Sequence, residues 1–183
     1  MKMKKLLAVT LSAAMTMAML AGCGGSNAAA PAATDAAAPA ATEAAAPAAQ
    51  AGKFTFETKG TVVAMKADAA PILDALGEPK SYTEETSCAF DGLDKNYVYT
   101  SYTITTYPDG DKDKINSLTL MDDTVSTSDK ISIGDSKEKV EAAYGADGFN
   151  GVNAYVMKEG EAQLTIIMDG DKVSSIQYAA IFE

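Results

Sequence analysis

The stretch Ile131-Ser-Ile-Gly-Asp-Ser-Lys-Glu-Lys-Val-Glu-Ala-Ala-Tyr-Gly145 decides the fold that we expect of this chain. It starts like a strand, and the part from Ser136 to Tyr144 has the apolar spacing of a short helix closed by glycine. A shift of 68 positions lays the earlier stretch Val63–Gly77 on it, with apolar residues and the closing glycine in register. The sequence therefore predicts a duplicated strand-and-helix unit.

Segments typical of strands follow each predicted helix, because they are rich in β-branched and aromatic residues and are separated by polar turns. The first helix has Asp68 as its candidate N-cap and Gly77 as its closing glycine, and Asp135 with Glu138 fits a capping box for the second. Phe54, Phe56 and residues 60–65 are expected to form the opening strands. The later expected strands are 89–90, 97–99, 102–107 and 115–121 in the first part, and 154–158, 163–168 and 173–182 in the second.

These elements predict an α+β fold for residues 53–183. Two tandem helix-plus-antiparallel-meander repeats, at about 53–123 and 124–183, would form a joined sheet with the helices on one face. A domain of this length buries roughly two thirds of its unfolded-chain surface, which is enough for a stable core without a cofactor.

The pattern Ile-x-Ile-Gly-x-Ser followed by Val-x-x-x-Tyr-Gly, with Gly134, Val140 and Gly145 as its most specific positions, resembles that of tandem β-lactamase-inhibitor-protein-like domains. It is also similar to the helix-plus-sheet unit of small outer-membrane-assembly lipoproteins. The resemblance covers about residues 60–183 and implies a sheet surface that grips a partner protein. The chain lacks tryptophan and the inhibitor's intradomain disulfides, so the resemblance implies the fold and not the inhibition.

The N-terminus is typical of a secreted protein. Residues 1–22 combine three lysines with an apolar run and a small-residue end, which predicts a signal peptide. Leu20-Ala-Gly-Cys23 resembles the lipobox of bacterial lipoprotein precursors, and this resemblance implies a diacylglyceryl group on Cys23 after cleavage before it. The alternative is an ordinary secreted protein with a chance cysteine at this position. With the lipid, the chain would be extracytoplasmic and anchored to the cell membrane.

Residues 23–52 form an Ala/Pro-rich linker with a near-perfect eight-residue repeat, and its regular prolines exclude a long helix. The whole chain has a net charge of −10, which becomes −13 when residues 1–22 and their three lysines are removed. Such an acidic chain repels nucleic acid and anionic headgroups, so we expect no nucleic-acid partner and a membrane contact through the lipid alone.

Catalysis is not expected, because the chain has no histidine and a Ser-His-Asp or Cys-His arrangement cannot form within it. Gly134-Asp135-Ser136 looks like the start of one hydrolase motif, but that motif needs a later histidine, so a helix-capping role is favoured. An enzyme that uses carboxylates alone stays open as an alternative, although no pair of acids is singled out.

No metal or cofactor is expected. Asp109, Asp111 and Asp113 alternate like the first ligands of a calcium loop, but Lys114 and Leu120 replace the glycine and the glutamate of that loop. A solvated turn is therefore favoured over weak calcium binding. Cys88, beside small and apolar residues, is interpreted as a buried packing residue, with a reactive thiol as the alternative.

Tyrosines give the strongest signal for a binding face, since tyrosine is enriched at the energetic centres of protein interfaces. The candidate binding residues are Tyr97, Tyr99, Tyr102 and Tyr107. The sequence thus predicts a non-enzymatic, lipid-anchored protein-binding module of the cell envelope, with an envelope or extracellular protein as partner. The alternative is a lipoprotein that binds a small molecule or a cell-wall fragment.

Overall fold

The computed structural model describes residues 53–183, so the predicted signal peptide, Cys23 and the Ala/Pro-rich linker lie outside the described residues. Within 53–183, no helix is long and apolar enough to cross a bilayer. The described elements are β1 (Phe56–Thr58), β2 (Thr61–Val63), α1 (Ala69–Leu76), β3 (Ser81–Thr86), β4 (Leu93–Val98), β5 (Tyr102–Asp109), β6 (Lys112–Leu120), α2 (Lys137–Tyr144), β7 (Ala154–Glu159), β8 (Ala162–Asp169) and β9 (Lys172–Ala180).

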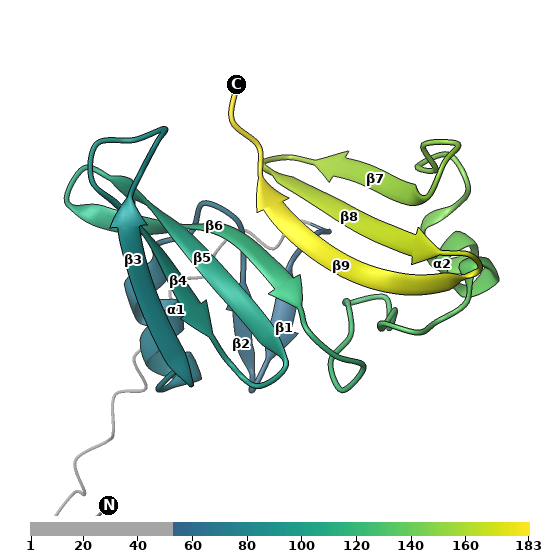
Figure 1. Cartoon of the computed structure of the whole chain (residues 1–183), viewed down its shortest axis with the longest axis horizontal. Helices are drawn as coiled ribbons and strands as arrows, with labels where there is room; N and C mark the ends of the chain where they lie inside the picture. Colours follow the sequence, from purple (N-terminus) through teal and green to yellow (C-terminus); the bar gives the residue numbers. More distant parts are fainter. Residues whose placement is uncertain (1–52) are drawn as a thin grey trace, which may run out of the picture. The chain divides into compact units, whose positions relative to one another are not determined.

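Seven strands form one antiparallel sheet in the order β3-β4-β5-β6-β9-β8-β7 (Figure 1). Tight Asp-Gly turns join β5 to β6 and β8 to β9, and Gly110 and Gly170 supply the left-handed conformation that these turns need. At the centre, β6 pairs with β9 through Ser117–Leu120 and Ile176–Ala179. The strands β1 and β2 form a separate two-stranded sheet.

The predicted α+β fold of two helix-plus-meander repeats is wrong. The described residues are mostly β, with nine strands against two helices of eight residues each. The two parts also differ: the first holds the separate β1–β2 hairpin and four strands of the large sheet, whereas the second gives that sheet three strands. The expected strand at Ile131 does not form, because Ile131 and Thr127 hydrogen-bond to each other within one loop.

The sequence match that suggested a repeat corresponds to a local backbone structure that both stretches adopt just before their helices. The amide of Lys66 donates to the Ile115 carbonyl and that of Gly134 to the Val173 carbonyl, each at 2.8 Å. Both residues have left-handed backbones, with φ of 59° at Lys66 and 88° at Gly134. The two stretches therefore enter their helices in the same way, but the likeness does not extend to the whole units.

The core lies on the helix side of the large sheet. Side chains alternate along each strand, and the buried set on the central strands is Tyr102, Ile104, Leu118, Leu120, Leu164, Ile166, Ile176 and Tyr178. Ile72 of α1, Val140 of α2, and Phe56 and Val63 of the hairpin belong to the same apolar cluster. Burial of each such side chain contributes about 1.5–3 kcal/mol. The core thus occupies one sheet face and leaves the other free of helices (Figure 1).

Candidate binding surface

The open face is the side of the large sheet that points away from the helices. Its residues follow from the strand registers and the alternation of side chains. In Figure 1 both helices lie behind the sheet. The central side chains of the open face are Thr103, Thr105, Ser117, Thr119, Gln163, Thr165 and Gln177.

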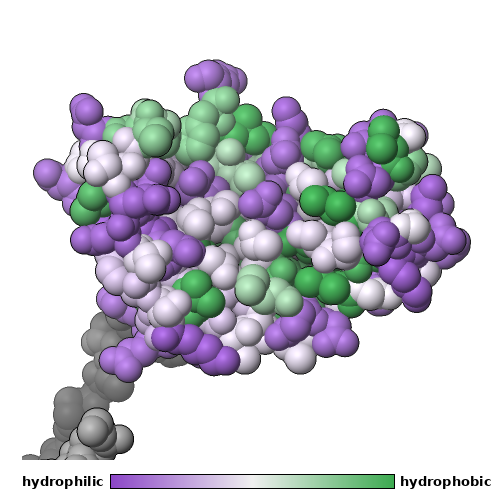
Figure 2. Space-filling model, in the orientation of Figure 1, coloured by the Kyte–Doolittle hydropathy of each residue, from purple (hydrophilic) through white to green (hydrophobic). Residues whose placement is uncertain are grey.

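These central residues are all uncharged, although the chain has a net charge of −10. Two pairs of them are also hydrogen-bonded: Thr105 Oγ1 lies 2.7 Å from Ser117 Oγ, and Gln163 Nε2 donates to Thr165 Oγ1 at 3.1 Å. Figure 2 shows this side as mostly pale, with strongly hydrophilic residues gathered mainly toward its margins. The open face is therefore a polar but uncharged surface with short, restrained side chains.

The open face differs between its two ends. At the β7–β8 end, Val156 and Ile167 are 37% and 38% exposed and add apolar area. At the β3–β4 end, Glu85 and Asp94 lie directly opposite each other on neighbouring strands. Lys158, which lies opposite Gln163, adds a positive charge at the β7–β8 end. The surface thus runs from an end with apolar and basic side chains through a neutral centre to an acidic end.

The four tyrosines predicted as a binding face are mostly core residues. Tyr99, Tyr102 and Tyr107 are buried, and Tyr99 stacks on Tyr102 with ring centroids 4.9 Å apart. Tyr97 is half-buried and packs against Tyr82 at 5.0 Å on the helix side of the sheet. Burial raises the pKa of all four predicted tyrosines. The four tyrosines do not lie together on an exposed surface, so they do not form the predicted binding face.

Sequence reasoning missed the neutral residues of the open face. A signal was present in Tyr102-Thr-Ile-Thr105, where large apolar residues alternate with threonine. The strand period places the two threonines on the face opposite the core. The tyrosines drew attention because of their size, but large aromatic residues are also the ones that a core buries most readily.

The Asp109–Asp113 segment forms the hairpin turn between β5 and β6, and one of its aspartates is in an ion pair. Asp113 Oδ2 accepts a hydrogen bond from Lys95 Nζ at 2.7 Å, and Asp111 is exposed at the turn between β5 and β6. Across residues 53–183, no group of three or more histidine, cysteine, aspartate or glutamate side chains is placed to hold a metal ion. The prediction of a turn in this segment is confirmed by its position between the paired strands β5 and β6.

Cys88 is exposed, so its interpretation as a buried packing residue is wrong. It lies in the loop between β3 and β4, where Ser87 Oγ accepts hydrogen bonds from the amides of Ala89 and Phe90. Phe90 is the packing residue of this loop, with its ring 4.7 Å from that of Tyr107. The loop therefore folds back through Phe90, and the thiol is left at the surface.

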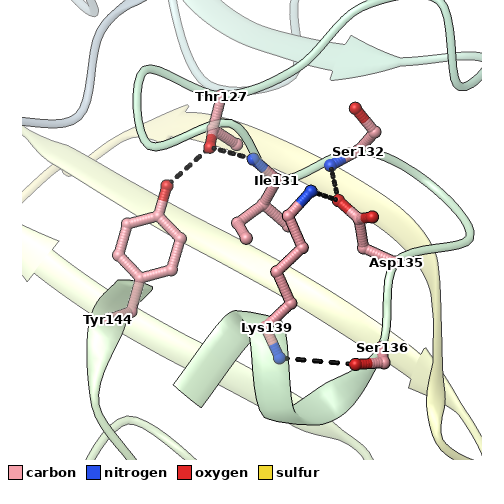
Figure 3. Close-up of polar contacts among 7 residues, drawn as sticks. All are labelled: Thr127, Ile131, Ser132, Asp135, Ser136, Lys139 and Tyr144. Carbon is pink, nitrogen blue, oxygen red and sulfur yellow. Dashed lines mark hydrogen bonds and ion pairs between the residues drawn. The ribbon is translucent and has the colours of Figure 1, made fainter. Parts of the chain in front are cut away.

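The Gly134-Asp135-Ser136 segment is structural, but the capping roles differ from those expected. Ser136 is the N-cap of α2, and its Oγ accepts from the Lys139 amide (Figure 3). Asp135 Oδ2 accepts from the Ser132 amide and from Lys139 Nζ, each at 2.7 Å. Burial alone would raise the pKa of the Asp135 carboxyl, but these hydrogen bonds outweigh it and hold that pKa below its usual value. Asp135 thus fixes the loop before the helix.

Thr127 ties the same loop to the end of α2. Its Oγ1 accepts from the Tyr144 hydroxyl at 2.7 Å and from the Ile131 amide at 3.2 Å (Figure 3). Thr127 and Ile131 are buried, and burial raises the pKa of Tyr144. This polar cluster has its donors and acceptors paired with one another, which is the arrangement of a structural support.

Comparison with known proteins gives little further information. No protein-family model matches the chain, and no relative was found among curated proteins. One solved structure that is similar is an extracellular protein containing an SCP domain from Bacillus anthracis str. Ames, with 11% sequence identity and a TM-score of 0.41. The match covers 63% of this chain and 44% of that chain, so the chain spans less than half the length of this neighbour.

Proposed function

We propose that this protein is an extracytoplasmic, lipid-anchored, non-enzymatic module that binds another protein of the cell envelope through its open face. The observation that carries the proposal is the uncharged centre of that face on a strongly acidic chain. The centres of protein interfaces are depleted of charged residues, and their charged residues lie at the rim. A sheet surface that faces only solvent is under no such constraint, and lysine and glutamate would be expected on it.

The restrained side chains support the same proposal. Threonine and serine lose little side-chain entropy when they are covered, and the bonds between Thr105 and Ser117 and between Gln163 and Thr165 already limit their motion. The exposed Val156 and Ile167 at one end would add apolar area to the interface. A partner that lies along the sheet would therefore meet a largely pre-ordered surface.

The proposed anchor is Cys23, and its support is Leu20-Ala-Gly-Cys23 after the apolar run of residues 1–22. The Ala/Pro-rich linker would then separate the folded part from the membrane. The test is Cys23→Ser in the full chain followed by membrane fractionation. We expect the variant to leave the membrane fraction; retention there at the unchanged level would contradict the anchor.

Binding through the open face is tested with charge substitutions at its centre. Thr119→Arg combined with Thr165→Arg places two long cations on the face, and Thr100→Arg combined with Ser128→Arg places the same charge on exposed loops outside it. Envelope proteins retained by each full-length variant are compared by quantitative mass spectrometry. We expect at least one protein to be retained by the unmodified chain and the loop variant and reduced tenfold or more by the face variant. Identical sets of retained proteins would overturn the proposal.

A second candidate function is the binding of a small molecule or a cell-wall fragment. It is favoured by a cavity of about 590 Å³ between the start of α1 and the helix side of β4, with Pro71, Leu73 and Tyr97 beside Asp74 and Lys112. This volume lies within the roughly 300–1,000 Å³ of small-molecule pockets. Calorimetric titration with soluble cell-wall fragments tests it, and binding that Tyr97→Ala leaves unchanged would contradict this location.

A further inference from the structure

An acidic hollow of about 290 Å³ lies at the β3–β4 end of the open face, where β3, β4, β5 and β6 contribute to its walls. The lining residues that matter here are Thr83, Glu85, Asp94, Asn96, Thr105 and Asn116. The volume lies at the lower limit of small-molecule pockets. It therefore suits the end of one long side chain better than a whole small molecule.

The carboxylates of the hollow are not neutralised by the protein itself. Glu85 and Asp94 are directly opposite each other in the antiparallel register, and like charges in that relation destabilise a sheet. Neither forms a salt bridge among residues 53–183. Lys95 lines the hollow, but its ammonium group is bonded to Asp113, which lies outside the lining. The hollow is thus built with a net negative charge.

Unpaired acceptors gather at the same place. Five buried side-chain oxygens lack a hydrogen-bond partner within the described part of the chain, and two of them, Asp94 Oδ1 and Asn96 Oδ1, belong to open-face residues that line the hollow. A buried oxygen without a donor destabilises the fold. A donor that enters the hollow would pair with these oxygens, and the Asn96 oxygen is an observation independent of the two carboxylates.

We propose that the hollow receives a lysine or arginine side chain of the partner protein that binds the open face. The inference rests on the proposed function, and it adds the chemistry of the partner: a basic residue at the position that meets the β3–β4 end. A cationic side chain supplies several N–H donors and no acceptor, which matches a lining of carboxylate, amide and hydroxyl oxygens. It would also remove the repulsion between Glu85 and Asp94.

A bound calcium ion is the competing occupant. Calcium prefers six to eight oxygen ligands, including several carboxylates. No group of three such side chains is placed for a metal anywhere in residues 53–183. The geometry therefore favours an organic cation, and calcium becomes one outcome of the test.

The test is an NMR titration of the full chain in detergent micelles, labelled with ¹⁵N-asparagine. Asn96 and Asn116 line the hollow, whereas Asn150 and Asn153 lie between α2 and β7 and serve as internal controls. The probes are the N-acetyl, N-methylamide derivatives of arginine and lysine, and the uncharged norleucine derivative is the matched control. We expect the two cationic probes to shift the Asn96 and Asn116 signals to saturation and the norleucine probe to leave them unchanged.

Two isosteric variants, Asp94→Asn and Glu85→Gln, should each weaken the cationic probes at least fivefold, because they remove charge without changing shape. The proposal is overturned if norleucine shifts the same signals, if the signals of Asn150 and Asn153 move equally, or if neither cation has an effect. Saturation by calcium chloride at lower concentration than by the cationic probes would also overturn it.

The outcomes separate this inference from the proposed function. If the hollow binds the cations but the Thr119 and Thr165 substitutions leave protein capture unchanged, the proposed function fails and the cation site remains. If capture depends on those threonines while Asp94→Asn and Glu85→Gln retain the same partner with the same affinity, the open face remains and the hollow has no role in it.

Discussion

Lys112 Nζ lies 2.6 Å from Asp68 Oδ2, so a lysine at the start of β6 is tied to the residue that precedes α1. Lys114 donates to the other oxygen of the same carboxylate. Asp68 was expected to cap the helix, and it occupies the N-cap position, but its side chain makes no capping hydrogen bond. Its carboxylate instead joins α1 to the sheet.

This contact predicts a dependence of stability on pH. Hydrogen bonds from Lys112 and Lys114 lower the pKa of Asp68 from 3.8 to about 2. The folded state therefore binds this proton more weakly than the unfolded state, and the stabilisation is present above pH 4 and is lost as the pH falls toward 2. Urea unfolding of Asp68→Asn should give a lower midpoint at pH 6 and a smaller loss between pH 4 and pH 2 than the unmodified chain. Parallel pH curves for the two would contradict this role.

Two buried tyrosines should respond in opposite ways to removal of the hydroxyl. The Tyr178 hydroxyl has no hydrogen-bond partner within residues 53–183, whereas that of Tyr155 donates to Glu141 Oε1 at 2.8 Å. We expect Tyr178→Phe to raise the free energy of unfolding by about 1 kcal/mol and Tyr155→Phe to lower it by about 1–2 kcal/mol. Chemical denaturation measures both. A loss of stability in Tyr178→Phe equal to that in Tyr155→Phe would show that the Tyr178 hydroxyl is bonded after all.

Lys130 has a left-handed backbone, with φ of 65°, in the loop before α2. This conformation costs a residue with a side chain roughly 1–2 kcal/mol, and glycine adopts it freely. Because glycine also increases the entropy of the unfolded chain, we expect Lys130→Gly to raise the free energy of unfolding by a net of about 0.5–1 kcal/mol. Lys158→Gly, at an exposed side chain of β7, is the control and should be destabilising. The prediction fails if both substitutions lower stability equally.

Phe182 holds the chain after β9 against the β3–β4 loop. Its ring lies 5.0 Å from Tyr107 in an edge-on arrangement and 5.2 Å from Phe90. An aromatic pair contributes about 0.5–1.5 kcal/mol beyond its buried area. Phe182→Ala should therefore lower the free energy of unfolding by about 1–2 kcal/mol and accelerate hydrogen exchange of the Phe90 amide. Val152→Ala, at a side chain that is 80% exposed, should do neither; unchanged exchange at Phe90 in Phe182→Ala would contradict the contact.

Local features of the fold, such as the end of a helix, were predictable where a single residue determines the backbone conformation. Gly77 and Gly145 end their helices as expected, with φ of 79° and 80° and their amides bonded to Leu73 and Glu141. The alternation in Tyr102–Tyr107 correctly indicated a strand. These signals depend on backbone freedom and on the two-residue period, and both can be read from neighbours in the sequence.

Other features depend on contacts between distant residues and were missed. Ser81–Thr86 is an edge strand in which every residue is exposed, so it has no buried side to give a pattern. The expected strand at Ala89–Phe90 is instead a loop anchored by Phe90 on Tyr107. The open face was missed for the same reason, since its neutrality becomes visible only when the four strands β5, β6, β9 and β8 are set side by side.

The pairing of β6 with β9 also bears on how the chain comes to be folded. Its partners are 56 to 62 positions apart in the sequence, and such long-range pairings form slowly. Because the chain emerges with its N-terminal side first, the β3–β6 meander would be complete before β9 is available to pair with the Ser117–Leu120 edge. An unpaired edge of alternating leucine and threonine invites pairing with other chains. The interval between the emergence of β6 and of β9 is therefore a period in which this edge is exposed to aggregation, and slower emergence of residues 121–171 would lengthen it.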